Sequence, residues 1–198
     1  MRKLTKTIVS FLVIFIVFVT VVGCLDWHLL QSKPQVISAH EGLEKTNSIA
    51  KGWRQNATLV VIYSAGEVTS EGKATKWRYS YAELSMITNT TKGYDVILSS
   101  DGSFTTYETK SPPTRYALSN WTIDSDEAIK IARENPTIST YLSTYKGATI
   151  ESMAIGANQT CSGWTIEWSD QGFMDNPHSA KISIDANTGN VIYIESDA

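Results

Sequence analysis

Large apolar residues alternate with polar or small ones most clearly in two short segments, 77–83 and 164–169. The apolar positions are Trp77, Tyr79 and Tyr81 in the first segment and Trp164, Ile166 and Trp168 in the second. A period of two is typical of a β-strand that buries one face. Both segments are therefore predicted to be antiparallel strands, and we expect their aromatic stripes to be core rather than a ligand cradle.

Six further segments are rich in β-branched and aromatic residues, which favours strands. The eight predicted strands lie at 58–64, 75–84, 94–100, 104–109, 149–156, 163–169, 180–185 and 191–196. The third and fourth strands are separated by the short turn Ser100–Ser103, and the seventh and eighth by Ala186–Asn190. Each turn contains Gly together with Asp or Asn. Such turns predict β-hairpins.

Three helices are predicted from start and stop signals. Ser38–Glu41 and Asp124–Glu127 each place a capping residue three positions before a glutamate, which is the capping box that begins a helix. The first helix is expected to extend to Trp53, and the second must end before Pro136, where a helix would lose a hydrogen bond. A short third helix is predicted over 137–145.

The two halves of the chain repeat this order of elements, and Trp77 and Trp164 are 87 residues apart. The repeat predicts an α+β fold of two tandem units, at 35–109 and 116–198, each with a helix packed on an antiparallel sheet of about four strands. The segment 110–115, with two prolines, is the predicted linker. Each unit is small for an independent core, so we expect the two to pack together.

The N-terminus has the form of an export signal. Three basic residues stand among the first six, and a 17-residue apolar run, 7–23, follows them. Val21–Cys24 is similar to the lipobox of prokaryotic lipoproteins, which implies a lipid on Cys24. An uncleaved signal anchor and a released protein are the alternatives, because the run is slightly longer than the usual apolar region of a signal peptide and slightly shorter than a comfortable membrane span. We expect residues 1–24 to tether the body to the cell membrane, outside the cytoplasm.

Charge and cysteine content narrow the function further. The net charge is −3 at pH 7, whereas nucleic-acid binding requires clustered Lys and Arg, so no nucleic-acid partner is expected. If Cys24 carries lipid, Cys161 has no disulfide partner. No neighbouring residue in the sequence would activate its thiol, so we interpret Cys161 as a small residue at a strand entry.

The second unit resembles the PepSY domain family over roughly 120–196. The similarity lies in "NWTIDSDEAIKIAREN", "GWTIEWSD" and "AKISIDANTGNVIYIES", of which the hairpin Ile184–Gly189 is the most specific part. The first unit is interpreted as a diverged copy, because Gly42 and "LSSDG" depart from the pattern. The resemblance implies a non-catalytic, extracytoplasmic module that binds proteins or inhibits peptidases.

Few residues suggest chemistry. His28, His40 and His178 stand far apart, and the sequence has no HExxH, GxSxG or Walker-type motif. The loop Asp170–His178 holds carboxylates, but not at the spacing of a calcium-binding EF-hand, so a solvated loop is predicted. We therefore predict no catalytic residue, no metal site and no cofactor.

Two kinds of surface residue remain as candidates. Phe173 and Met174 are apolar residues within a long polar loop, and they either contact a partner or fold back onto the core. The four Asn-X-Ser/Thr sequences are candidate glycosylation sites, and they begin at Asn56, Asn89, Asn120 and Asn158.

These observations favour an exported, membrane-tethered, non-catalytic protein that binds or inhibits an unknown extracytoplasmic protein, such as a peptidase. A structural protein of the cell envelope without a specific ligand is the first alternative. An extracytoplasmic hydrolase with a dispersed site is the second.

Overall fold

The computed structural model describes residues 35–83, 92–114, 116–170 and 177–197. All eight predicted strands are present, and each end lies within one residue of its predicted position. The first half contains α2 (Leu43–Trp53), β1 (Ala57–Ser64), β2 (Lys76–Glu83), β3 (Gly93–Ser99) and β4 (Phe104–Thr109). The second half contains α3 (Ser125–Glu134), α4 (Pro136–Thr144), β5 (Thr149–Ala157), β6 (Ser162–Ser169), β7 (Ser179–Asp185) and β8 (Val191–Ser196).

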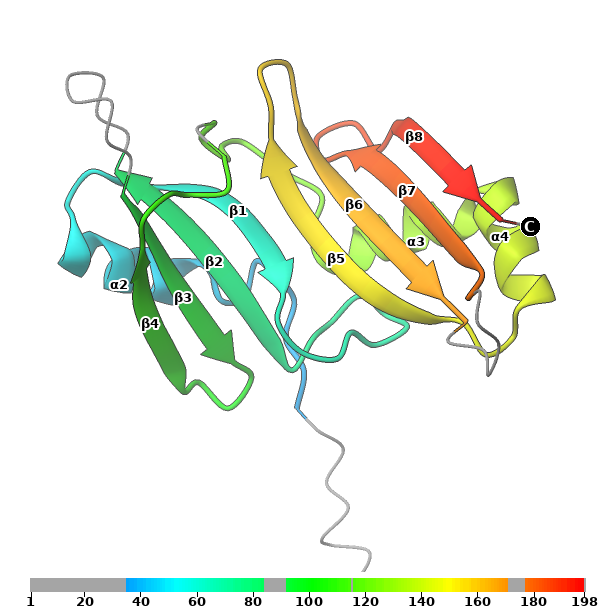
Figure 1. The fold of residues 1–198 in the computed structure, drawn as a ribbon, viewed down its shortest axis with the longest axis horizontal. Coiled ribbons are helices and arrows are strands. Elements are labelled where there is room, and N and C mark those ends of the chain that lie inside the picture. The colour runs from blue at the N-terminus through cyan, green and yellow to red at the C-terminus, as the bar shows by residue number, and fades with distance from the viewer. Residues whose placement is uncertain (1–34, 84–91, 115, 171–176, 198) are drawn as a thin grey trace, which may run out of the picture. The chain divides into compact units, whose positions relative to one another are not determined.

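The strands form one antiparallel sheet in the order β4-β3-β2-β1-β5-β6-β7-β8 (Figure 1). The α+β class is confirmed, but the two four-stranded sheets expected from the repeat are the two halves of a single sheet. They join where Val61, Ile62 and Tyr63 of β1 pair with Gly156, Ile155 and Ala154 of β5. This pairing satisfies backbone groups that two separate sheets would leave on exposed edges. Residues 36–198 accordingly form one compact unit.

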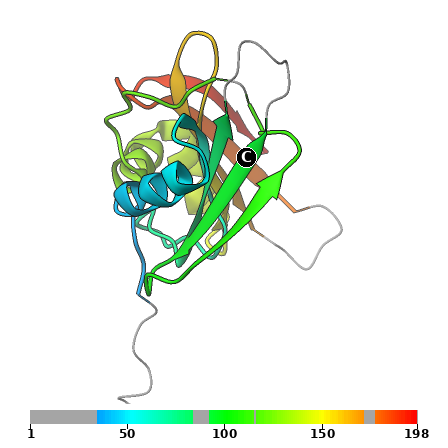
Figure 2. The same ribbon diagram turned by 90° about the vertical axis from the view of Figure 1, so that its left-hand side faces the viewer.

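The described helices, α2 to α4, lie on one face of this sheet, and Figures 1 and 2 show none of them on the opposite face. Helix α2 contacts β1 and β3, and α3 and α4 contact strands of the second half. The predicted aromatic stripes point toward the helices and are at most 1% exposed; they are Trp77, Tyr79, Tyr81, Trp164, Ile166 and Trp168. They belong to one buried cluster that extends through both halves, so the prediction of a core role is confirmed.

The start of the first helix differs from the prediction. The reciprocal bonds of the capping box do form, since the Ser38 amide donates to Glu41 Oε2 (2.6 Å) and the Glu41 amide to Ser38 Oγ (3.4 Å). They close a turn rather than a helix, and α2 begins only at Leu43, after Gly42. A side chain at Gly42 would overlap the ring of Tyr79, with Cζ at 2.8 Å from the added carbon. The turn therefore lets the backbone lie directly on the sheet.

The start of α3 connects the two halves. Asp124 is the N-cap, as predicted, and its Oδ1 accepts from the Ser125 amide (2.7 Å) and also from the His40 amide (3.1 Å). Ser125 Oγ accepts from the Ala39 amide (3.2 Å). Glu127, the other end of the predicted box, lies 3.7 Å from the ammonium of Lys130 instead. The cap thus binds backbone from the other half, which a local motif does not predict.

The repeat is visible in one pair of contacts. The indole N–H of Trp77 donates to the carbonyl of Ile37 (2.8 Å), and that of Trp164 donates to the carbonyl of Ile123 (2.7 Å). Each bond fastens the segment before a helix to the second strand of its half. The two indole rings meet edge to face, with centroids 6.3 Å apart. The duplicated tryptophans therefore form the centre of the shared core.

Candidate functional site

The sheet face opposite the helices, called the open face below, carries one continuous row of side chains. Directly paired residues project to the same side of a sheet, so the register defines a row that crosses all eight strands. From β4 to β8 its members are Thr105, Ile97, Arg78, Tyr63, Ala154, Thr165, Ser183 and Tyr193. Its aromatic members are Tyr63, near the middle of the row on β1, and Tyr193, at its β8 end. Small residues lie between these two rings.

In the first half, Arg78 is held between two tyrosine rings. Its guanidinium carbon lies 5.0 Å from the ring centroid of Tyr63 and 4.8 Å from that of Tyr107. It forms an ion pair with Asp95, whose other oxygen accepts from Ser80 Oγ (2.6 Å). Burial raises the pKa of the Tyr63 and Tyr107 hydroxyls, so both rings stay neutral and flank the cation. Arg78 is thereby fixed and its charge is paired.

In the second half, Lys181 and Glu167 form an ion pair on the open face. Lys181 Nζ lies 2.5 Å from Glu167 Oε1, and Ser152 Oγ donates to Glu167 Oε2 (2.8 Å). Hydrogen bonds from Lys181, and then from Ser152, lower the pKa of Glu167. The hydroxyl of Tyr193 donates to Glu195 Oε2 (2.7 Å). The open face therefore presents rings and small polar groups more than unpaired charge.

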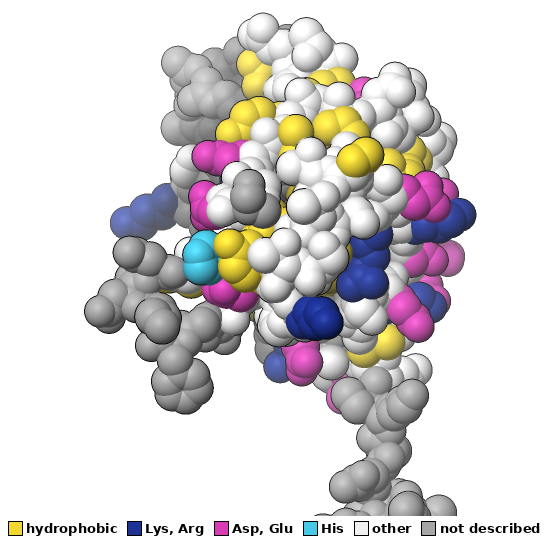
Figure 3. Space-filling view, turned by 90° about the vertical axis from the view of Figure 1, so that its right-hand side faces the viewer, with side chains coloured by type: hydrophobic (Ala, Val, Ile, Leu, Met, Phe, Trp, Pro, Cys, Tyr) yellow, Lys and Arg dark blue, Asp and Glu magenta, His cyan; other side chains and the backbone are white. Residues whose placement is uncertain are grey.

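A hollow of about 310 Å³ lies on the open face beside β8. It is lined by uncharged residues, namely Gly156, Ala157, Asn158, Cys161, Gly163, Trp164, Thr165, Ser183, Ile192 and Tyr193. Gly156 and Gly163 pair directly across β5 and β6. Ile192 and Tyr193 are 52% and 49% exposed. Figure 3, which looks onto the β8 end of the unit, shows several hydrophobic side chains at the surface there.

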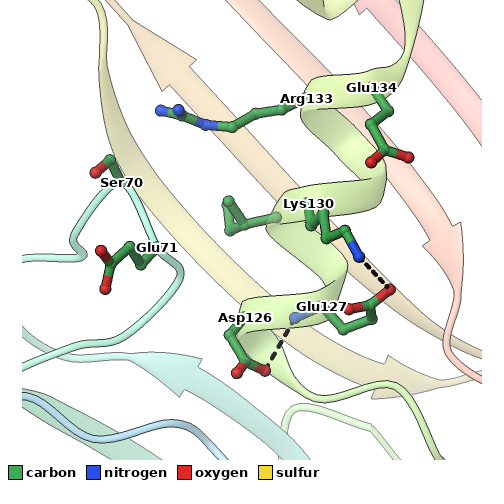
Figure 4. Close-up of a pocket in the computed structure, with 8 residues that line it drawn as sticks. Ser70, Glu71, Asp126, Glu127, Lys130, Arg133 and Glu134 are labelled. Atoms are coloured by element: carbon green, nitrogen blue, oxygen red, sulfur yellow. Dashed lines mark hydrogen bonds and ion pairs between the residues drawn. The ribbon is translucent and has the colours of Figure 1, made fainter.

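A second hollow, of about 450 Å³, lies between the β1–β2 loop and α3 (Figure 4). Ser70 and Glu71 of the loop line it, together with Ile129 and five charged residues of α3, which are Asp126, Glu127, Lys130, Arg133 and Glu134. Acidic groups in the first turn of a helix are favourable against its dipole, and Lys130 pairs with Glu127. The helix itself therefore explains Asp126, Glu127 and Lys130.

The structure tests only some of the residues singled out from the sequence. Phe173 and Met174, the proposed partner contacts, lie outside the described residues, as do Cys24 and Asn89. The other three glycosylation candidates are exposed and lie outside helices and strands, as predicted; they are Asn56, Asn120 and Asn158. Glycosylation and lipidation themselves stay predictions.

The two described histidines lie in similar surroundings, each stacked on an aromatic ring and beside an aspartate. His40 stacks on Trp121, with centroids 3.9 Å apart, and its Nδ1 lies 4.0 Å from Asp124 Oδ2. His178 stacks on Tyr145, with centroids 4.3 Å apart, and its Nδ1 lies 3.0 Å from Asp170 Oδ2. Within the described ranges, no group of three or more His, Cys, Asp or Glu side chains is placed to hold a metal ion. In the same ranges, no helix is long and apolar enough to cross a membrane, and the apolar run 7–23 lies outside them.

Sequence reasoning missed the open-face row and its hollow. The predicted strands located the polar positions, but not the pairing of β1 with β5 that aligns them. One signal was present: Gly156 and Gly163 stand at the end and the start of two successive predicted strands, and glycine within a strand is unfavourable.

Comparison with known proteins assigns no family. No protein-family model matches the chain, and no curated protein matches it either. The PepSY resemblance therefore stays a prediction. Among solved structures, a protein from Clostridium difficile 630 described as a "putative lipoprotein" is similar, with a TM-score of 0.49 and 13% sequence identity. The similarity covers 85% of this chain and 98% of that one, and at this level it carries no conclusion about function.

Proposed function

We propose that this protein is a membrane-tethered, non-catalytic module that captures an extracytoplasmic protein on the open face of its sheet. The N-terminal segment 1–24 supplies the tether, either through lipid on Cys24 or as an uncleaved anchor. The PepSY resemblance favours a peptidase as the captured protein. The single observation that carries the proposal is the row of side chains that crosses all eight strands.

The composition of that row supports protein binding. Interfaces are enriched in Tyr and Arg at their centres, and rigid aromatic side chains lose little entropy on binding. Here Tyr63, Tyr107 and Arg78 form one such cluster, and Tyr193 stands at the far end. Because Arg78 and Lys181 are each paired with a carboxylate within the chain, the face meets a partner without leaving either cation uncompensated.

The experiment that tests this proposal is site-specific photo-cross-linking in native membranes. The photoreactive residue p-benzoylphenylalanine replaces Thr105 or Ala154 on the open face of the full chain. The matched controls carry it at Lys51 of α2 or Lys130 of α3, on the helix side. We expect one and the same protein to be linked from both open-face positions and from neither control.

Two outcomes would contradict the proposal. Equal linking from the helix side would remove the open face as the binding surface, and no specific product from any position would favour a structural envelope protein. Turnover of ester, peptide or glycoside substrates by the purified full chain would favour a hydrolase instead. If a partner is found and is a peptidase, inhibition is checked by adding the full chain to it and measuring peptide cleavage.

A further inference from the structure

We infer that the hollow at Gly156 and Gly163 holds one uncharged, apolar or aromatic side chain of the captured protein. The inference rests on the proposed function, because it assigns an anchor residue to the same open face. It is carried by three features of the hollow: the two glycines of its floor, its uncharged lining and its aromatic wall.

The fold itself does not require a glycine at position 156. Positive backbone φ angles occur at Gly72, Gly102 and Gly189, but not at Gly156 or Gly163. A Cβ added to Gly156 would meet only Val61 Cγ2, at an ordinary 3.4 Å. Glycine in a strand interior is unfavourable, and it often marks a place where a ligand or another chain approaches closely. The missing side chain therefore leaves room for something outside this chain.

Gly163, the partner of Gly156 across the strands, extends the same floor. A Cβ there would lie 3.2 Å from the carbonyl oxygen of Ile184 and 3.4 Å from Cδ1 of Ile192. Packing within the chain therefore partly explains a glycine at position 163, but it does not explain the glycine at position 156. Together the two glycines leave the floor of the hollow without side chains, and Ile192 lies beside it.

The walls of the hollow suit an apolar group. The ring of Tyr193 is about half exposed, and its hydroxyl is held by Glu195 at 2.7 Å, so the ring itself stays available. Aromatic rings pack favourably against apolar side chains and against each other. Ile192 adds exposed aliphatic surface on the same side.

The charge distribution disfavours a charged occupant. No described lining residue carries a charge, and the nearby Glu167 and Lys181 neutralise each other at 2.5 Å. A carboxylate entering the hollow would lose water without gaining a cation, and an ammonium would find only the exposed Glu195, which lies outside the lining and already accepts from Tyr193. At about 310 Å³, the hollow is at the low end of ligand sites, which run from roughly 300 to 1,000 Å³. That size suits one side chain, the usual form of an interface anchor.

The binding test uses the isotopically labelled full chain in lipid nanodiscs. N-acetyl-phenylalaninamide is titrated while the amide signals of Gly156 and Gly163 are followed by NMR, and N-acetyl-lysinamide serves as the charged probe. We expect saturable shifts at both glycines with the phenylalanine probe, with a Kd on the order of 1 mM for a ligand this small. Absence of shifts, or equal shifts with the lysine probe, overturns the inference.

A substitution then connects the hollow to the partner. Gly156→Val fills the floor at a position whose backbone accepts a side chain, and Gly147→Ala, where an added Cβ meets nothing within 4 Å, is the control. Both variants should unfold at a urea midpoint no lower than wild type. We expect Gly156→Val alone to abolish the probe shifts and to lower cross-linking from Thr105 at least tenfold.

The outcomes separate this inference from the proposed function. If Gly156→Val leaves cross-linking at the wild-type level, the anchor site is wrong while the open face remains the binding surface. If no open-face position links a partner at all, the proposed function fails. In that case the inference fails with it, whatever the titration shows.

Discussion

The partly buried indole–carbonyl bonds allow the sharpest test of the fold. In Trp164→Phe, the carbonyl of Ile123 loses its donor at 2.7 Å inside a core where Trp164 is fully buried. An unsatisfied buried acceptor costs about 1–3 kcal/mol. The smaller ring leaves part of the indole volume empty, which adds about 1 kcal/mol. We therefore expect the free energy of unfolding to fall by about 2–4 kcal/mol.

The matched control is Trp53→Phe, because the indole N–H of Trp53 donates to the carboxylate of Glu108 in an exposed position (3.0 Å). Removing that bond should cost less than about 1 kcal/mol, since water replaces the lost partner. Urea unfolding of the full chain, followed by far-UV circular dichroism, measures both. With an m-value of about 1–3 kcal/mol per molar urea, Trp164→Phe should lower the midpoint by roughly 1–3 M. Equal midpoints for the two variants would refute the assigned role of Trp164.

Three further predictions use the same unfolding assay. Arg78→Ala leaves the buried carboxylate of Asp95 without its cation and should lower the free energy of unfolding by about 3 kcal/mol. The double variant Arg78→Ala, Asp95→Ala should lose less stability than the sum of the two single variants, and strict additivity would contradict the pairing. Pairing with Lys181 lowers the pKa of Glu167 from 4.5. The pair therefore adds to the free energy of unfolding above pH 4.5, and this contribution is lost as the pH falls through the lowered pKa. Glu167→Gln should therefore narrow the difference in stability between pH 7 and pH 3.5, and an unchanged difference would count against the pair. Gly72→Ala places a side chain at φ 77° and 2.8 Å from Ile129 Cγ1, so it should cost at least about 1 kcal/mol, and a stabilised variant would contradict the loop geometry.

Local patterns were sufficient for the elements themselves. The alternation at Trp77, Tyr79 and Tyr81 predicted both a strand and its buried face, because a period of two follows directly from strand geometry. Pro136 separated α3 from α4, since proline cannot continue a helix but is well placed at the first position of one. These signals depend only on neighbours along the chain.

Other features depended on contacts between distant residues. The box at Ser38–Glu41 made its predicted hydrogen bonds, yet α2 began at Leu43, because the turn packs against Tyr79 from another strand. Asp124 accepts from the amide of His40, far away in the sequence. Local motifs specify which bonds a residue can make, whereas packing selects the partner.

The candidate site shows this division most clearly. The sequence alone determined eight strands, three helices, the aromatic core stripes and a polar alternate face, because each follows from side-chain periodicity and turn chemistry. Only the tertiary structure decided that β1 pairs with β5, since strand pairing between distant segments is set by the burial and hydrogen bonding of the whole sheet. That one pairing aligns Arg78 and Tyr63 with Thr165 and Tyr193 in a single row, and so it creates the open face.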